Sequence, residues 1–223
     1  MADRTAWTTF RTLGLIGSLR YTRVKWLTAT EGVFPITRLG TRFVAAPGAS
    51  ELLRIRRGTD DLAGYACTFL DRTYDDLLPS TAGERPLVID ANPGAGFAAV
   101  ALTTTTATEV VALTDDPGLY LALRKNTAQC GDAVCCERTT IHEANLDALA
   151  ASRSIAMLRL RATDAVELLT VAPNWLARVQ RIVVDEATSA TSAAIAEAGY
   201  TIDLHTNVLV VHRTQLSSRR AAA

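Results

Sequence analysis

The sequence predicts an α/β domain with a mostly parallel, Rossmann-like sheet, preceded by an N-terminal helical and β-hairpin extension. From residue 87 onward, short apolar runs alternate with helix-forming segments, and the runs at 87–89 and 110–113 suit strands buried on both faces. A glycine-rich turn, 92–96, directly follows the first of these runs. Such alternation requires right-handed crossovers and helices on both sides of the sheet.

The length of 223 residues suits one well-buried core plus an extension, and it is too short for two full α/β domains. Lys+Arg and Asp+Glu both number 23, so the average charge favours neither nucleic acid nor an acidic membrane as a partner. No stretch approaches the ~20 apolar residues that cross a bilayer, and two glycines interrupt the apolar run 13–19. We therefore expect a cytoplasmic protein. A homo-oligomer is compatible with the sequence.

Residues 1–84 form the expected extension, and residues 85–223 form the Rossmann-like domain. The extension begins with a basic helix, whose charged residues are typical of a solvated face. Apolar residues on both sides of a Leu-Gly-Thr break predict a β-hairpin over 33–44, and a helix is expected over 60–70. The polar segment 79–86, which contains proline and glycine, marks the expected boundary between the two parts.

Within the second part, helices are expected to start at Phe97 and at Pro117, the latter capped by Asp116 and ending near Gly131. Asp164 is expected to cap a later helix together with Glu167. Further strands are expected over 139–142, 156–160, 181–185, 200–205 and 208–212, with helices over 164–171 and 190–198. Only two residues separate the last two strands, which predicts a hairpin and hence an antiparallel strand at the end of the sheet.

The four cysteines do not form a metal-binding pattern. Cys130, Cys135 and Cys136 cluster, but adjacent cysteines suit zinc poorly and no histidine pair lies near them at ligand spacing. Ordinary thiols on a strand or loop, in a reducing compartment, are the expected interpretation. No metal site is predicted.

The turn after the first strand is the candidate ligand site, because open parallel sheets bind ligands beyond the carboxyl ends of their strands. Asp90 ends that strand, and Gly94 and Gly96 would let backbone N–H groups approach a ligand. A plain strand-to-helix turn would have similar residues. The pattern by itself does not distinguish a nucleotide phosphate from a methionine carboxylate.

Over residues 36–213 the chain resembles the FkbM family of S-adenosylmethionine-dependent methyltransferases. The resemblance is carried by the segments 36–50, 69–75, 110–127 and 158–185, and the second of these retains Arg72, Tyr74 and Asp75. It implies a class I methyltransferase fold, S-adenosylmethionine as cofactor, and methyl transfer to a hydroxyl of a small secondary metabolite. On this resemblance, the cofactor-binding positions are Asp90, Asn92, Gly94, Gly96, Thr114, Asp115 and Asn145.

Several of these positions depart from the family's pattern. Asn92 stands in place of the first glycine, and Thr114 replaces the acid that binds the ribose, with Asp115 one residue late. Arg161 and Thr163 replace two carboxylates of the fourth strand, and an arginine is no general base near neutral pH. We therefore expect S-adenosylmethionine to bind weakly or not at all.

The candidate catalytic residues are Arg161, Asp185, His142 and Tyr74. Arg161 would either reach the mouth of the sheet and bind substrate oxygen, or pair with Asp90, Asp164 or Asp185 as a plug. His142 would end the third strand near an adenine, and Tyr74 would close the cleft or simply pack. Three functions stay open: methyl transfer, a repurposed non-methylating enzyme such as a cyclase or pericyclase, and a non-catalytic binding subunit.

Overall fold

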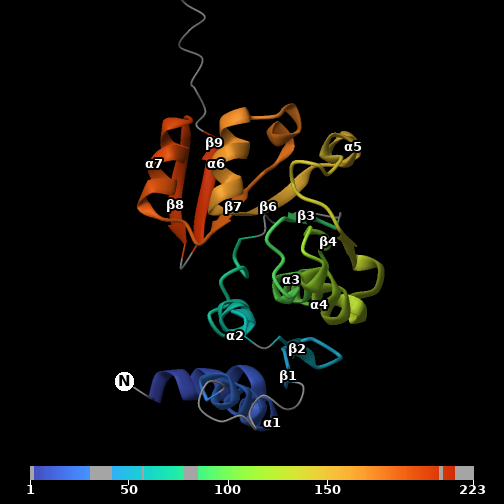
Figure 1. Cartoon of the computed structure of the whole chain (residues 1–223), viewed down its shortest axis with the longest axis vertical. Coiled ribbons are helices and arrows are strands. Elements are labelled where there is room, and N and C mark those ends of the chain that lie inside the picture. Colours follow the sequence, from blue (N-terminus) through green and yellow to red (C-terminus); the bar gives the residue numbers. More distant parts are fainter. Residues whose placement is uncertain (1–2, 31–41, 57, 78–84, 206–207, 214–223) are drawn as a thin grey trace, which may run out of the picture.

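The computed structural model describes residues 3–30, 42–56, 58–77, 85–205 and 208–213, and a seven-stranded sheet lies at its centre (Figure 1). The strand order is β5-β4-β3-β6-β7-β9-β8, and β9 runs in the direction opposite to that of the other six strands. The chain moves outward from β3 to β5 and then crosses back to β6, so the order reverses between β3 and β6. The strands are β3 (Leu87–Asp90), β4 (Glu109–Leu113), β5 (Val134–Glu137), β6 (Ile155–Arg161), β7 (Ile182–Asp185), β8 (Tyr200–His205) and β9 (Val208–Arg213).

This topology confirms the predicted Rossmann-like sheet with one antiparallel strand. One detail was wrong: β9 lies between β7 and β8 rather than at the end of the sheet. The two-residue link does make β8 and β9 a hairpin, but β9 pairs with β7 as well and thereby leaves β8 at the edge.

Helices cover both faces of the sheet. The helices α3 (Phe97–Thr106) and α4 (Pro117–Thr127) pack on one face, and α5 (Leu146–Ser152), α6 (Ala162–Val171) and α7 (Ser189–Glu197) pack on the other. Successive side chains of β3 pack on opposite faces of the sheet: Val88 packs toward α3, and Leu87 and Ile89 pack toward α6. Two 3₁₀ turns, η3 (Ala128–Ala133) and η4 (Asn174–Arg178), complete this part.

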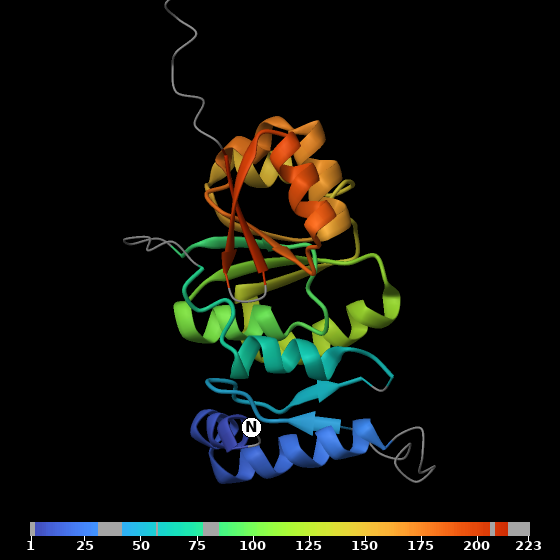
Figure 2. The ribbon, with the colours of Figure 1, turned by 90° about the vertical axis from the view of Figure 1, so that its left-hand side faces the viewer.

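The extension adds further layers beneath α3 and α4 (Figure 2). It consists of α1 (Asp3–Ala29), the antiparallel pair β1 (Arg42–Val44) and β2 (Leu53–Ile55), and α2 (Asp61–Tyr65), which continues as the π-helical turn η2 (Ala66–Leu70). Tyr65 is fully buried at the junction, where its ring contacts the rings of Tyr21 and Phe97. Among the described residues, no helix is long and apolar enough to cross a membrane.

Most local predictions agree with the structure, including the helix over 60–70 and the cap of α4. Asp116 accepts a hydrogen bond from the Leu119 backbone N–H at 2.7 Å, and this bond lowers the pKa of its carboxyl. Arg161 rather than Asp164 occupies the cap position of α6. The hairpin expected over 33–44 lies largely outside the described residues, as does most of the boundary segment 79–86. Residues 42–44 form β1, which pairs with β2.

The prediction of the third strand was wrong. The strand is β5, and residues 139–142 form a turn that buries Ile141 in the core. Gly131, with φ 56° and ψ −136°, breaks η3, so the chain enters the strand directly afterwards. Cys135 and Cys136 lie on this strand, and Cys136 pairs with Ala112 of β4.

Candidate functional site

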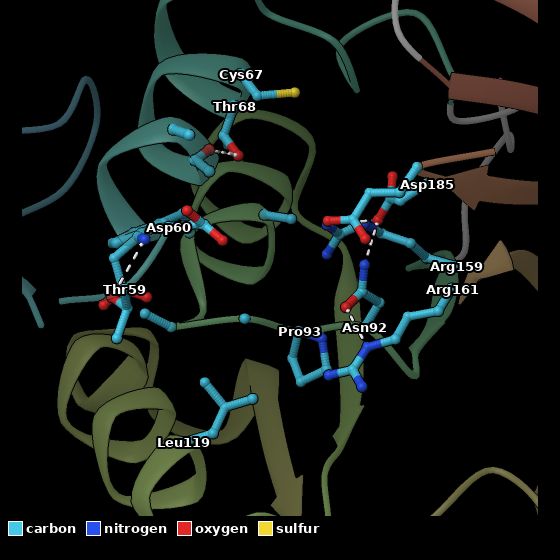
Figure 3. Close-up of a pocket in the computed structure, with 18 of the residues that line it drawn as sticks. Thr59, Asp60, Cys67, Thr68, Asn92, Pro93, Leu119, Arg159, Arg161 and Asp185 are labelled. Atoms are coloured by element: carbon cyan, nitrogen blue, oxygen red, sulfur yellow. Dashed lines mark hydrogen bonds and ion pairs between the residues drawn. The ribbon is translucent and has the colours of Figure 1, made fainter. Parts of the chain in front are cut away.

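A cavity of about 510 Å³ opens at the carboxyl edge of β3, β6 and β7, beneath the α2–η2 helix (Figure 3). This is the edge at which the strand order reverses and at which α/β sheets bind ligands. One part of the lining comes from the segment 59–68, another from the loop after β3, and a third from the ends of β6 and β7.

The register of the strands brings charged residues together at this edge. Asp90 on β3 pairs with Arg159 on β6, and Arg161 on β6 pairs with Asp185 on β7. Side chains two residues apart share a face of the sheet, so all four project toward α3 rather than toward α6. Apolar residues precede them on that face, so the charged residues lie only at the carboxyl ends of these strands.

Arg159 joins the two acids in a buried network. Its Nη1 donates to both carboxylate oxygens of Asp90 at 3.1 Å, and its Nη2 lies 2.7 Å from Oδ2 of Asp185. The side chain of Arg159 is 11% exposed, that of Asp90 is 0% exposed and that of Asp185 is 8% exposed. The guanidinium also lies 4.8 Å from the ring centre of Tyr74, whose hydroxyl donates to Asp185 Oδ1 at 3.1 Å.

Burial and charge act against each other in this network. Burial raises the pKa of the Asp90 carboxyl, and the guanidinium beside it opposes that rise. For Arg159, burial disfavours the charged form, but Asp90, Tyr74 and Asp185 together raise its pKa well above the usual range. Burial also raises the pKa of the Tyr74 phenol. At neutral pH, Arg159 is therefore charged and Tyr74 is a hydrogen-bond donor.

Asn92 connects this network to Arg161. Its backbone N–H donates to Asp90 Oδ1 at 3.1 Å, and its side-chain amide donates to Asp185 Oδ2 at 2.8 Å. These bonds direct the amide oxygen of Asn92 toward Arg161, whose Nε donates to it at 3.0 Å. Arg161 is exposed and lines the cavity. Its terminal nitrogens form no hydrogen bond or ion pair with the described residues.

The two glycines of the loop have different roles. Gly94 has a φ of 52° and lines the cavity, and a Cβ added there would meet no atom within 4 Å. Gly96 has a φ of 89°, and a Cβ there would lie 2.9 Å from side-chain atoms of both Leu123 and Thr127 on α4. Gly96 therefore allows helix packing, whereas Gly94 leaves open space at the cavity.

The opposite wall contains an ion pair that the sequence did not reveal. Nε of Arg56 donates to both oxygens of Asp61, and its Nη2 donates to Oδ1 at 2.7 Å. The hydrogen bond to Asp61 raises the pKa of Arg56. Arg56 lies between β2 and α2, where neither periodicity nor a motif marks it. Arg159 did carry a signal, because a basic residue in a strand buried on both faces requires a partner.

Four candidate site residues lie away from the cavity. Thr114 is buried and its N–H donates to Glu137 O, while Asp115 is exposed. Asn145 caps α5 by accepting from Ala148 N at 3.2 Å. His142, in the turn that replaces the expected third strand, has its Nε2 3.6 Å from a carboxylate oxygen of Glu167 on α6. Thr114 and Asp115 follow β4, and His142 and Asn145 follow β5, whereas the cavity lies at the ends of β3, β6 and β7.

Of the positions that the FkbM resemblance assigns to S-adenosylmethionine, Asn92 and Gly94 line this cavity. Asp90 has no exposed surface and its carboxylate is bound by Arg159 and by Asn92. Thr114, Asp115 and Asn145 do not line the cavity. No cluster of side chains suited to a metal ion occurs in the described part of the chain.

Comparison with solved structures finds methyltransferases. The chain is similar to a METTL16 methyltransferase domain, with 14% identity, a TM-score of 0.49 and 66% of each chain covered. It is similar to TYW2 of M. jannaschii in complex with AdoMet, with 14% identity and a TM-score of 0.46 over 77% of this chain and 83% of that one. It is also similar to precorrin-6y C5,15-methyltransferase from Geobacter metallireducens GS-15, with 14% identity and a TM-score of 0.48 over 65% of this chain and 87% of that one.

No family model and no curated protein matches the chain. The chain spans about two thirds of the length of the METTL16 domain. At such identities the likeness concerns the fold alone. The mostly parallel seven-stranded sheet and its covering helices have the arrangement of Rossmann-like methyltransferase folds.

Proposed function

We propose that this chain is a small-molecule enzyme that keeps a methyltransferase fold but does not perform methyl transfer. The observation that carries the proposal is that the two acids that end β3 and β7, Asp90 and Asp185, are both bound by other side chains of the protein. Arg159 and Asn92 together bind Asp90 and Asp185, while Arg161 stands in the cavity without a carboxylate partner among the residues that the structure describes.

The cavity indicates the class of substrate. Its volume of about 510 Å³ falls in the range of small-molecule sites. Pro93, Phe97 and Leu119 supply apolar surface, and the opposite wall carries the hydroxyls of Thr59 and Thr68. A small organic molecule with an apolar body and an oxygen-bearing end suits this division.

Arg161 is suited to bind that oxygen. Its Nε bond to Asn92, which Asp185 holds in turn, orients the guanidinium and leaves the terminal nitrogens as donors. Such donors bind a carboxylate, and they stabilise an oxygen that gains negative charge in a transition state. A cyclisation or pericyclic step needs orientation and hydrogen bonds rather than a general base, so the arrangement suits this type of reaction.

FkbM-type methyl transfer to a hydroxyl is the second candidate. The observation that favours it is Gly94, which keeps a left-handed backbone and open space at the cavity in the loop where the resemblance places the cofactor. This candidate requires S-adenosylmethionine to bind although Asp90 is occupied and no acid stands at position 114.

Calorimetric titration with S-adenosylmethionine and with its demethylated product separates the two. Loss of a ribose contact to a carboxylate costs about 1.5–3 kcal/mol, or roughly tenfold or more in Kd. The occupation of Asp90 removes a second contact, so we expect a Kd weaker than about 100 µM. Binding in the low micromolar range would contradict the loss of the cofactor positions, on which the first candidate rests.

A metabolite assay tests the positive part of the proposal. The purified chain is incubated with a small-molecule extract of its host, and mass spectrometry follows which compounds disappear. We expect a compound to be consumed without the gain of a methylene, at a rate that falls in Arg161→Met. A compound that binds to the purified chain but is never converted would instead indicate a non-catalytic binding subunit.

A further inference from the structure

A second cavity, of about 200 Å³, lies in the extension between α1 and the β1–β2 pair. Arg20, Arg23 and Arg42 line it, and the apolar side chains of Phe43 and Leu52 lie beside them. Arg42 is buried and donates to the Thr28 hydroxyl and the Leu27 carbonyl. Arg20 and Arg23 are exposed and form no ion pair with any described residue. The cavity therefore presents positive charge next to apolar surface.

The outer side of α1 continues this surface. Leu15, Leu19 and Trp26 are 63%, 63% and 56% exposed, and Ile16 is 68% exposed. The spacing of Leu15, Leu19 and Trp26 places them opposite the side of the helix that buries Val24 against the rest of the extension. Large apolar side chains grouped in this way mark an interaction site more often than scattered single ones do. Both views show α1 as the outermost layer at one end of the molecule (Figures 1 and 2).

The charge of this layer differs from that of the whole chain. The chain is neutral overall, yet α1 (Asp3–Ala29) contains five basic residues and one acidic residue. Gly14 interrupts the helix with non-helical backbone angles, and the part after it contains Arg20, Arg23 and Lys25 but no acidic residue. Neutral composition predicts no membrane partner, and that prediction rests on the average charge of the whole chain rather than on the charge of α1. A second copy is a poor occupant of this face, because two such helices would repel each other. An anionic surface is complementary to it.

We propose that the outer face of α1 docks on an anionic lipid bilayer. Leu15, Leu19 and Trp26 enter the boundary between headgroups and acyl chains, and a lipid phosphate binds Arg20 and Arg23 at the 200 Å³ cavity. An interfacial helix with apolar residues outward and basic residues beside them binds membranes in this manner, without crossing them. The proposal does not depend on the function proposed for the larger cavity.

Vesicle binding tests the proposal with the full chain. Vesicles of phosphatidylcholine alone are compared with vesicles that also contain phosphatidylglycerol, by co-sedimentation and by tryptophan fluorescence. We expect binding to the anionic vesicles at least tenfold tighter, weakened by salt, with a blue shift that Trp26→Phe removes. Because each basic residue near an anionic surface contributes about fivefold, the double variant Arg20→Gln/Arg23→Gln should bind about 25-fold more weakly.

The double variant Leu15→Ser/Leu19→Ser should lose about tenfold in binding. The control Leu204→Ser replaces one exposed leucine of β8, outside the proposed face, and should lose none. Equal binding to both kinds of vesicle, or none to either, would overturn the proposal. Self-association in sedimentation that the serine variant abolishes, without vesicle binding, would assign the face to a second copy. Retention of an acidic protein without vesicle binding would assign it to a protein partner.

Discussion

Replacing Arg159 with methionine tests whether the buried network has the charges assigned to it. Methionine keeps much of the volume of arginine but removes the cation between Asp90 and Asp185. Breaking a buried ion pair by removing one partner costs about 3–5 kcal/mol, because the remaining charge stays buried without compensation. At roughly 2–4 °C per kcal/mol for a chain of this size, the Tm should fall by about 6–20 °C near pH 8.

The loss should depend on pH in a defined direction. Burial already raises the pKa of Asp90, and without Arg159 only the hydrogen bond from the Asn92 backbone N–H opposes that rise. A carboxyl whose pKa is higher in the folded state than in the unfolded state stabilises the fold when protonated, and this contribution is lost as the pH rises through the folded pKa. The deficit of the variant should therefore be largest near pH 8 and shrink as the pH is lowered toward about 4.5.

Thermal unfolding of wild type and variant at several pH values measures both effects. The matched control is Arg161→Met, two residues along the same strand, which removes an exposed guanidinium that has one hydrogen bond and should change the free energy of unfolding by about 1 kcal/mol or less. A deficit for Arg159→Met that equals that of the control, or that does not change with pH, would refute a charged network between the strands.

Two further predictions concern how the loop and the extension are held. Asn126 is buried and bonds to the backbone of Arg54 twice and to Ala95 O once, so Asn126→Ala should cost about 2–4 kcal/mol in urea unfolding, and a loss below 1 kcal/mol would contradict this. Gly96→Ala should destabilise the chain by about 2–4 kcal/mol and Gly94→Ala by only about 1 kcal/mol, because both adopt positive φ but only Gly96 would clash with α4. Equal losses in denaturant titrations would show that the clash is relieved.

The sequence predicted well the parts of the fold that local chemistry determines. The strand ending at Asp90, the glycine turn after it and the Asp116 cap each depend on residues that are neighbours in the chain. The third strand was misplaced because both Val134–Glu137 and the segment 139–142 are short and weakly apolar. What decides between them is the pairing of β5 with β4, which no local pattern contains.

The site was predicted less completely, because its contacts join distant residues. Alternation placed Arg159 and Arg161 on one side of β6, but it did not show which of them pairs with the acids. The register between β6 and β3 decides which arginine binds the acids, because it places Arg159 directly beside Asp90. Arg161 lies two residues further along β6, at the end of the strand. The Arg56–Asp61 pair depends on how the extension packs over the sheet edge, and no sequence pattern in the segment 56–61 predicts it.

The charged residues of the larger cavity bear on the substrate class that we propose for it. Among the described lining residues, the cations are Arg56, Arg159 and Arg161, and the acids are Asp60, Asp61, Asp185 and Glu186. Asp61 binds the first through two nitrogens, and the second lies between the buried pair Asp90 and Asp185. Arg161 alone faces the cavity with a neutral partner, the amide oxygen of Asn92. A methyl donor would bring a further positive charge toward this guanidinium, whereas an oxygen-bearing or anionic substrate would supply the partner that it lacks.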